Sequence, residues 1–334
     1  MHRPSRRPPA PLRHAWAAGA LSVLAATGCG GQPPIGVLRP APPLAVPREA
    51  LAFLVLGDWG RHGEYNQRRV AQAMDSTARR LDAAFIVATG DNFYPDGVAG
   101  VDDPAWRASF EDVYTGHALH VPWYVVLGNH DYHGNVQAEL DYGRRSRRWR
   151  MPARYFSVRH AVDDTTALEL FHLDTSPFIR EYHAEAADYP GLTAQDTVAQ
   201  RRWLDSALVA STAQWKLVVG HHHVYSGGKR GTNADLEPFL VPRLERHGVA
   251  AYLSGHEHVL QHVLRPGGTV HYFISGAGSE VRRPGNAPGT RYSEGRQGFL
   301  AVSATARELL VQAIDYAGTV RYRTTIPRTR GPAR

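Results

Sequence analysis

The sequence predicts an α/β fold, because short apolar strands alternate with amphipathic helices and five of the strands end in polar loops. The five runs and the loops that follow them are LAFLVL and GDWG, AAFIVA and TGDNFY, WYVVL and GNHD, WKLVV and GHHH, and VAAYL and SGHEH. Helical periodicity between several of these runs covers residues 66–81, 193–210 and 236–247. This alternation of strands and helices is typical of an α/β fold.

Seven further runs look like strands, but few helices separate them. They cover residues 155–160, 167–173, 259–264, 269–275, 297–304, 308–314 and 319–325. Strands joined without crossover helices pair mainly with antiparallel neighbours, so we expect these runs to form a second, largely antiparallel sheet. The chain has 334 residues, of which 43% are hydrophobic, and we expect one large domain over residues 49–328.

Residues 1–28 have the layout of a secretory signal, with arginines at the start, an apolar stretch from Ala15 to Ala26, and two small residues at the end. The apolar stretch is too short to span a bilayer comfortably. Cys29 follows at once, and LAATGC resembles a bacterial lipoprotein signal, in which the cysteine is lipidated, although Ala26 replaces the usual leucine. We therefore expect an exported protein, either secreted or held at the cell envelope by this lipid or an uncleaved signal.

Residues 29–48 are rich in proline and lack apolar periodicity, which indicates an extended tether. Because Cys29 is the only cysteine, no disulfide can form within the chain. The formal net charge is +7, and removing the four arginines of residues 1–28 leaves 7 − 4 = +3. This excess suits an anionic substrate, but nucleic-acid binding usually needs a dense basic face.

The five polar loops carry the side chains most suited to chemistry. Taken singly, an Asp or Asn after a strand is usually a turn residue. In an open α/β sheet, however, loops at the carboxyl ends of strands converge. The candidate residues in the five loops are Asp58, Asp91, Tyr94, Asn129, His130, His221, His256 and His258. This mixture of carboxylate, phenol, amide and imidazole suits divalent or trivalent transition metals.

The series GDWG, GDNFY, GNHD, VVGHHH and SGHEH resembles the five metal-binding motifs of the calcineurin-like metallophosphoesterases. It is most similar to the purple acid phosphatase subtype, in particular the tartrate-resistant acid phosphatase type. The first motif is Asp-x-Gly rather than Asp-x-His, and the second carries Tyr94. The resemblance covers about residues 51–281 and implies a four-layer α/β/β/α sandwich of two mixed β-sheets flanked by helices.

The resemblance also implies two metal ions. Asp58, Tyr94 and His258 would hold one ion, Asn129, His221 and His256 would hold the other, and Asp91 would bridge both. Two carboxylates and a phenolate are hard anionic ligands that favour Fe(III), whereas two imidazoles and an amide favour Fe(II), Zn(II) or Mn(II). His222 and His223 are expected to pack in the protein rather than bind metal, and Glu257 to point away from the metals.

The expected activity is hydrolysis of phosphate monoesters by a metal-bound hydroxide, with an acidic optimum because ferric iron lowers the pKa of bound water strongly. His130 is the candidate for protonating the leaving oxygen. Lys229 and Arg230 stand in a loop where many relatives carry a further histidine. They are candidates for binding the substrate phosphate, and a flexible basic loop in solvent is the alternative.

The run RRSRRWR, residues 144–150, contains five arginines, and clustered arginines suggest the hypothesis of nucleic-acid binding. A solvated face is the favoured interpretation, so we expect a small phosphorylated substrate and no nucleic acid. Contact with a membrane is expected only through the N-terminus. Two alternatives remain open: a phosphodiesterase or nuclease with the same metal centre, and a non-catalytic phosphate-binding relative.

Overall fold

The structure is a computed structural model that describes residues 41–328. The predicted signal sequence, Cys29 and most of the predicted tether lie outside the described residues. Residues 41–47 have no regular secondary structure, and the backbone of Ala45 exchanges two hydrogen bonds with the side chain of Gln312. Across residues 41–328, we find no helix with the length and apolar character needed to cross a bilayer.

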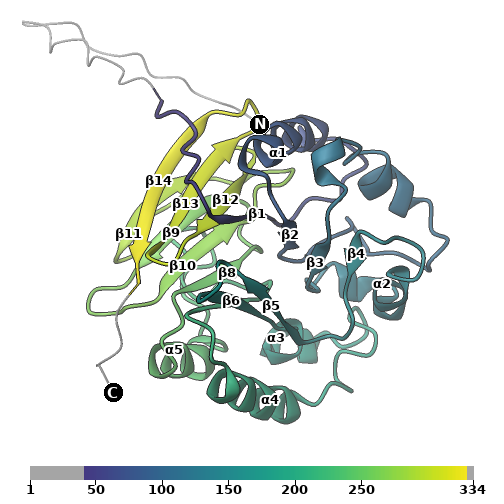
Figure 1. Ribbon diagram of the computed structural model, residues 1–334. Coiled ribbons are helices and arrows are strands. Elements are labelled where there is room, and N and C mark those ends of the chain that lie inside the picture. Colours follow the sequence, from purple (N-terminus) through teal and green to yellow (C-terminus); the bar gives the residue numbers. More distant parts are fainter. Residues whose placement is uncertain (1–40, 329–334) are drawn as a thin grey trace, which may run out of the picture. The chain divides into compact units, whose positions relative to one another are not determined.

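Two seven-stranded mixed sheets form the centre of the fold (Figure 1). In spatial order, the first sheet contains β14 (Val320–Pro327), β13 (Glu308–Asp315), β12 (Gly298–Ala304), β1 (Leu51–Leu56), β2 (Phe85–Ala88), β3 (Trp123–Val125) and β4 (Trp149–Arg150). The second contains β11 (Thr290–Glu294), β9 (Leu260–Leu264), β10 (His271–Ser275), β8 (Ala251–Ser254), β7 (Trp215–Val219), β6 (Ala167–His172) and β5 (Phe156–Ala161).

The expectation that the later strands form a separate, largely antiparallel sheet is wrong. Strand β12 pairs antiparallel with β1, whereas β10 pairs parallel with β8. The later strands therefore extend both sheets that begin with the motif-bearing strands, and each sheet combines parallel and antiparallel pairs. Periodicity reports which residues form a strand but not which neighbour the strand pairs with.

Side-chain alternation along the strands explains the layers. Phe53 and Val55 of β1 belong to the apolar core between the sheets, with Leu217 of β7 and Leu253 of β8. The alternate residues of β1, Leu54 and Leu56, lie in a second cluster that includes residues of helix α1 (Gln67–Leu81). A strand with both faces buried in this way needs apolar residues at every position, as LAFLVL provides.

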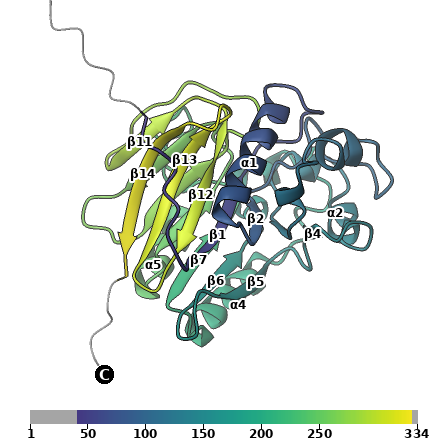
Figure 2. The same cartoon turned by 45° about the horizontal axis from the view of Figure 1, so that its top comes forward.

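Helices cover the outer faces of both sheets, and Figures 1 and 2 show α1 beside the first sheet and α4 and α5 near the second. The remaining helices are α2 (Val136–Tyr142), α3 (Arg180–Ala184), α4 (Thr197–Ala210) and α5 (Glu237–Arg246), with short helical turns at Trp106–Glu111, His117–Leu119, Asp131–His133 and Ser176–Phe178. Helix α4 begins later than predicted because Asp196 caps it by accepting a hydrogen bond from Ala199 N. The fold is confirmed as two mixed sheets flanked by helices.

The motif loops all follow parallel strands. In the first sheet β1, β2 and β3 are mutually parallel, and in the second β7 and β8 are parallel. The carboxyl ends of parallel strands meet at one edge of a sheet, so the topology brings the five loops together.

Candidate metal centre

The first predicted ligand group gathers around the phenol oxygen of Tyr94. This oxygen lies 3.1 Å from Asp58 Oδ1, 2.8 Å from Asp91 Oδ2 and 3.2 Å from His258 Nε2. All four side chains are buried. Loops after β1, β2 and β8, which belong to different sheets, therefore converge on one point.

The second predicted ligand group gathers around Nε2 of His221. This nitrogen lies 3.3 Å from Asn129 Oδ1, 3.1 Å from His256 Nδ1 and 3.4 Å from Asp91 Oδ1. Thus Oδ1 of Asp91 faces the second group and Oδ2 faces the first. The structure places Asp91 between the two groups, as a bridging carboxylate must be.

The residues fit a pair of cations. The Tyr94 hydroxyl has one proton but lies against two carboxylate oxygens, so at most one of these two contacts is an ordinary hydrogen bond. At His221, Nδ1 lies 2.9 Å from Thr89 O and donates to it, which leaves the lone pair on Nε2 pointing at the other ligand atoms. Lone pairs that converge in a buried site need a positive charge between them.

The electrostatics agree with this fit. Burial, and then the nearby Asp91, raise the pKa of Asp58 well above its usual value. Burial, followed by Asp58 and Asp91, raises the pKa of Tyr94. Burial also raises the pKa of Asp91, but the neighbouring His221 and His130 imidazoles and a hydrogen bond from His130 N outweigh it and leave the pKa lowered. Bound cations would stabilise the ionised forms of all three groups.

The imidazoles are held neutral, as metal ligands must be. Burial lowers the pKa of His258 to about 3 and that of His256 well below its usual value. Burial also lowers the pKa of His221, partly opposed by the charge of Asp91.

Three of the predicted ligands have left-handed backbone conformations. The φ angles are 58° at Asp58, 50° at Asp91 and 67° at His256. Such a conformation costs a non-glycine residue about 1–3 kcal/mol, and five other non-glycine residues among those described also adopt it, so it supports a functional role here only together with the convergence of the side chains. At Asp58 and His256 the two loops are also joined, since His256 N donates to Asp58 Oδ2 at 2.9 Å.

Comparisons with known proteins identify the family. Residues 51–260 match the family model described as calcineurin-like phosphoesterase. Purple acid phosphatase 4 of Arabidopsis thaliana is 38% identical over 282 residues, which cover 81% of this chain and 82% of that protein. Tartrate-resistant acid phosphatase type 5 of Mus musculus is 33% identical over 305 residues, which cover 86% of this chain and 93% of that protein.

The chain belongs to the purple acid phosphatases within this family. Membership makes the protein a phosphatase and implies a dinuclear metal centre. The solved structure of GAP50, the anchor in the inner membrane complex of Plasmodium, shares the fold, with a TM-score of 0.74 at 24% identity, covering 85% of this chain and 90% of that one.

Asp131, a buried carboxylate outside the predicted ligand groups, connects two of the loops that carry predicted ligands. Asp131 Oδ1 accepts hydrogen bonds from the backbone nitrogens of Asn92 and Phe93, and Oδ2 accepts from Gly128 N. Asp131 thereby ties the loop that carries Asp91 to the loop that carries Asn129. Burial, and then Asp91, raise its pKa to about 8. In the sequence, the only sign of this role is that Asp131 ends the motif GNHD, and an Asp at that position is equally typical of a turn.

His130 lies beside the first ligand group of the phosphatase. Its ring centroid is 4.4 Å from that of Tyr94, and Nδ1 lies 2.5 Å from the carbonyl oxygen of Pro95. The Nδ1 hydrogen is therefore donated to the backbone, and Nε2 is the nitrogen left to exchange a proton. Its backbone nitrogen also donates to Asp91 Oδ1 at 2.9 Å.

Lys229 and Arg230 differ in position. A cavity of about 220 Å³ is lined by Arg230, His256, His222, His223 and Tyr182 among others, and Lys229 does not line it. Arg230 therefore shares a hollow with a predicted metal ligand. Both side chains are exposed.

The histidines beside His221 have hydrogen-bond partners in the protein, although His222 also belongs to a group with His221 and His256 that could hold a metal ion. His222 lies between Thr175 Oγ1 and Tyr182 Oη, each 2.9 Å from a ring nitrogen. His223 Nε2 lies 3.1 Å from the carbonyl oxygen of Gly231 and so contacts the loop that carries Arg230.

The carboxylate of Glu257 faces this basic loop. It is buried, it accepts a hydrogen bond from Arg230 N at 3.4 Å, and a Cβ on Gly228 would lie 2.6 Å from Glu257 Cδ. Glu257 therefore contacts the loop that carries Gly228 and Arg230, and it belongs to neither predicted ligand group.

Sequence reasoning missed Arg61. Its guanidinium carbon lies 3.8 Å from the centroid of the Tyr94 ring, and its Nη2 lies 2.8 Å from Glu280 Oε2. A cation over a phenol ring favours the phenolate form. The five motifs do not indicate Arg61, because it contacts the ring face of Tyr94 and not a predicted ligand atom.

Proposed function

We propose that this phosphatase prefers phosphate monoesters and works best at acidic pH. The observation that carries the proposal is the division of the Asp91 oxygens between two ligand groups of different chemistry. The Asp58, Asp91, Tyr94 and His258 group offers three hard oxygen ligands, which suit Fe(III). The Asp91, Asn129, His221 and His256 group offers two imidazoles and an amide, which suit Fe(II), Zn(II) or Mn(II).

Two bound ions would supply positive charge for the phosphate oxygens and would acidify the attacking water. Residues of the chain would deliver the proton and bind the substrate. His130, held through Nδ1 by the Pro95 carbonyl, presents Nε2 to deliver a proton to the leaving oxygen. Arg230 offers a planar guanidinium to a phosphate or to the leaving group in the cavity beside His256.

The test is the ratio of kcat/KM for matched aryl phosphate monoester and diester substrates across pH, with Asp91→Asn as the metal-centre control. A strong monoester preference with an acidic maximum supports the proposal. A diester preference would reassign the substrate class while keeping the metal centre. A tightly bound metal pair without turnover of any ester would indicate a non-catalytic relative.

We also propose that the protein is exported and is either lipidated at Cys29 or secreted. The N-terminal signal pattern supports this. Cells labelled with a radioactive fatty acid should yield labelled protein if Cys29 is lipidated, and Cys29→Ser should abolish the label. Unlabelled protein in the medium would instead indicate simple secretion, and unlabelled protein in the cytoplasm would contradict export.

A further inference from the structure

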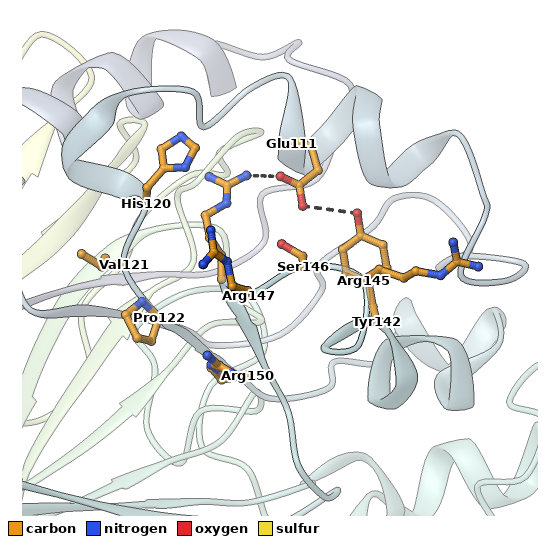
Figure 3. A pocket seen from close by; sticks show the side chains of 10 residues that line it. Glu111, His120, Val121, Pro122, Tyr142, Arg145, Ser146, Arg147 and Arg150 are labelled. Atoms are coloured by element: carbon orange, nitrogen blue, oxygen red, sulfur yellow. Dashed lines mark hydrogen bonds and ion pairs between the residues drawn. The ribbon is translucent and has the colours of Figure 1, made fainter.

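A hollow of about 760 Å³ lies at the amino end of β3, and arginines line much of it (Figure 3). Val121 and Pro122, which precede β3, form one wall, whereas Asn129 of the metal centre follows the same strand. The hollow and the metal centre therefore belong to opposite ends of β3.

The lining carries a net positive charge. It contains four arginines and one acid, which gives 4 − 1 = +3, and the lining arginines are Arg145, Arg147, Arg148 and Arg150. The acid, Glu111, is engaged by Arg148 and by the hydroxyl of Tyr142. Within residues 41–328, neither Arg147 nor Arg150 has an acidic partner, and Arg145 has only the exposed Asp102 at 3.2 Å. Exposed pairs of that kind contribute little.

The arginines project from an ordered backbone rather than from a loose basic tail. Arg148 is buried, with Nη1 donating to Tyr114 O at 2.6 Å and its guanidinium carbon 4.4 Å from the Phe110 ring centroid. On one side of it, Arg145 N donates to Tyr142 O at 2.8 Å. On the other, the Arg148 carbonyl accepts from Trp123 N at 2.6 Å and ties the segment to β3. Figure 3 shows Arg147, Arg150 and His120 around this hollow.

We propose that this hollow is a binding site, separate from the metal centre, for a small polyphosphate-bearing anion. Its volume falls in the range of roughly 300–1,000 Å³ typical of ligand pockets. Guanidinium groups match phosphate oxygens with paired hydrogen bonds. Like charges held around one hollow repel one another, and a ligand with several negative charges relieves that repulsion.

The test is titration calorimetry of the metal-loaded protein with tripolyphosphate at low ionic strength. Because the metal centre would also bind phosphate, the affinity of the hollow is measured in the Asp91→Asn background. There the double variant Arg147→Ala/Arg150→Ala should bind at least about tenfold more weakly, because hydrogen bonds from arginine to a charged phosphate are lost. The control Arg144→Ala/Arg323→Ala removes the same charge, with one arginine from the same run and one from β14, and should bind like Asp91→Asn alone.

Two further readouts separate this site from the metal centre. Asp91→Asn should retain the binding, and tripolyphosphate should protect backbone amides of residues 142–150 from hydrogen exchange. Phosphatase activity of the double variant, made without Asp91→Asn, should be unchanged. An unaltered affinity in the double variant, equal weakening in the control, or loss of binding in Asp91→Asn overturns the proposal. Tighter binding of a single-stranded oligonucleotide, lost in the same double variant, would overturn it in favour of nucleic acid.

Discussion

The phenol oxygen of Tyr94 lies 2.8 Å from Oδ2 of Asp91, in a site where both side chains are buried. Because burial and the two carboxylates raise the pKa of Tyr94, the phenol keeps its proton while no cation is present. A cation that binds here must displace that proton. Loading of the first ligand group should therefore release a proton from Tyr94 and weaken as the pH falls.

The colour of the iron-loaded protein tests the role of Tyr94. A ferric phenolate absorbs visible light, so the unchanged protein should be coloured and Tyr94→Phe should lose the visible band. Tyr65→Phe is the control, since Tyr65 is exposed and its ring centroid lies 5.4 Å from the guanidinium carbon of Arg61. Visible absorption and iron content are measured together, and a colourless unchanged protein with full iron content would contradict the ferric Tyr94 assignment.

A methyl group on Gly128 should disrupt the bridging carboxylate. A Cβ there would lie 2.2 Å from Asp91 Oδ1 and 2.3 Å from Asp91 N, which is too close for any side chain. We expect Gly128→Ala to lose bound metal and to fall by at least about 100-fold in kcat/KM, as for loss of a major catalytic contribution. Gly100→Ala meets nothing within 4 Å and should be neutral. Elemental analysis of both variants checks this, and full metal content in Gly128→Ala would refute it.

His130→Ala should lower kcat while the metals stay bound, because the His130 ring is hydrogen-bonded to the Pro95 carbonyl and not to a predicted ligand atom. Loss of a general acid lowers the rate by about 10²–10⁴-fold. The control is His133→Ala, whose ring lies 5.5 Å away and bonds Asp188 O. Activity on an ester with a leaving group that needs no proton should fall much less. An equal loss on both ester types would argue against proton transfer by His130.

The structure separates the two basic residues of the loop after β7. Arg230→Ala should raise KM by about tenfold or more, since a hydrogen bond to a charged group contributes about 1.5–3 kcal/mol. Lys229→Ala should leave KM unchanged, because Lys229 does not line the cavity that Arg230 shares with His256. Steady-state kinetics on one monoester decide between them. An equal effect of the two changes would mean that loop charge, rather than a contact made by Arg230, is responsible.

His172 should make the fold less stable in acid. Burial against Phe156, whose ring centroid is 4.4 Å away, lowers its pKa to about 3. The folded state therefore binds fewer protons than the unfolded state below the usual histidine pKa, and stability is lost as the pH falls from about 6.5 toward 3, by about 2–3 kcal/mol at pH 4.5.

The variant His172→Phe tests this by removing the titrating group and keeping an aromatic ring. The difference in Tm between pH 7 and pH 4.5 should be smaller in His172→Phe than in the unchanged protein. His117→Phe, at an exposed position, should leave that difference as it was. If His172→Phe changes Tm equally at both pH values, His172 does not titrate on unfolding in acid.

The sequence could place the ligand loops because each directly follows an apolar run, and strand ends are a local property. It could not assign strands to sheets, since pairing of β12 with β1 depends on residues about 250 positions apart. Contacts between residues far apart in the sequence are equally hard to predict when they are made by side chains. Asp131 serves the backbone of a different loop, and Arg61 covers the ring of Tyr94, but in the sequence both are ordinary polar residues.

The left-handed backbone at Asp58, Asp91 and His256 bears on how this fold changes over evolution. Glycine adopts such conformations without steric strain, so glycine at any of the three positions would relieve the strain, at the cost of a larger loss of chain entropy on folding. Descendants that keep the sandwich only as an anchor or scaffold are therefore expected to drift toward glycine or asparagine at these three positions. In this chain the two carboxylates and the imidazole occupy positions where the backbone favours glycine or asparagine, as expected if their side chains are needed to bind metal.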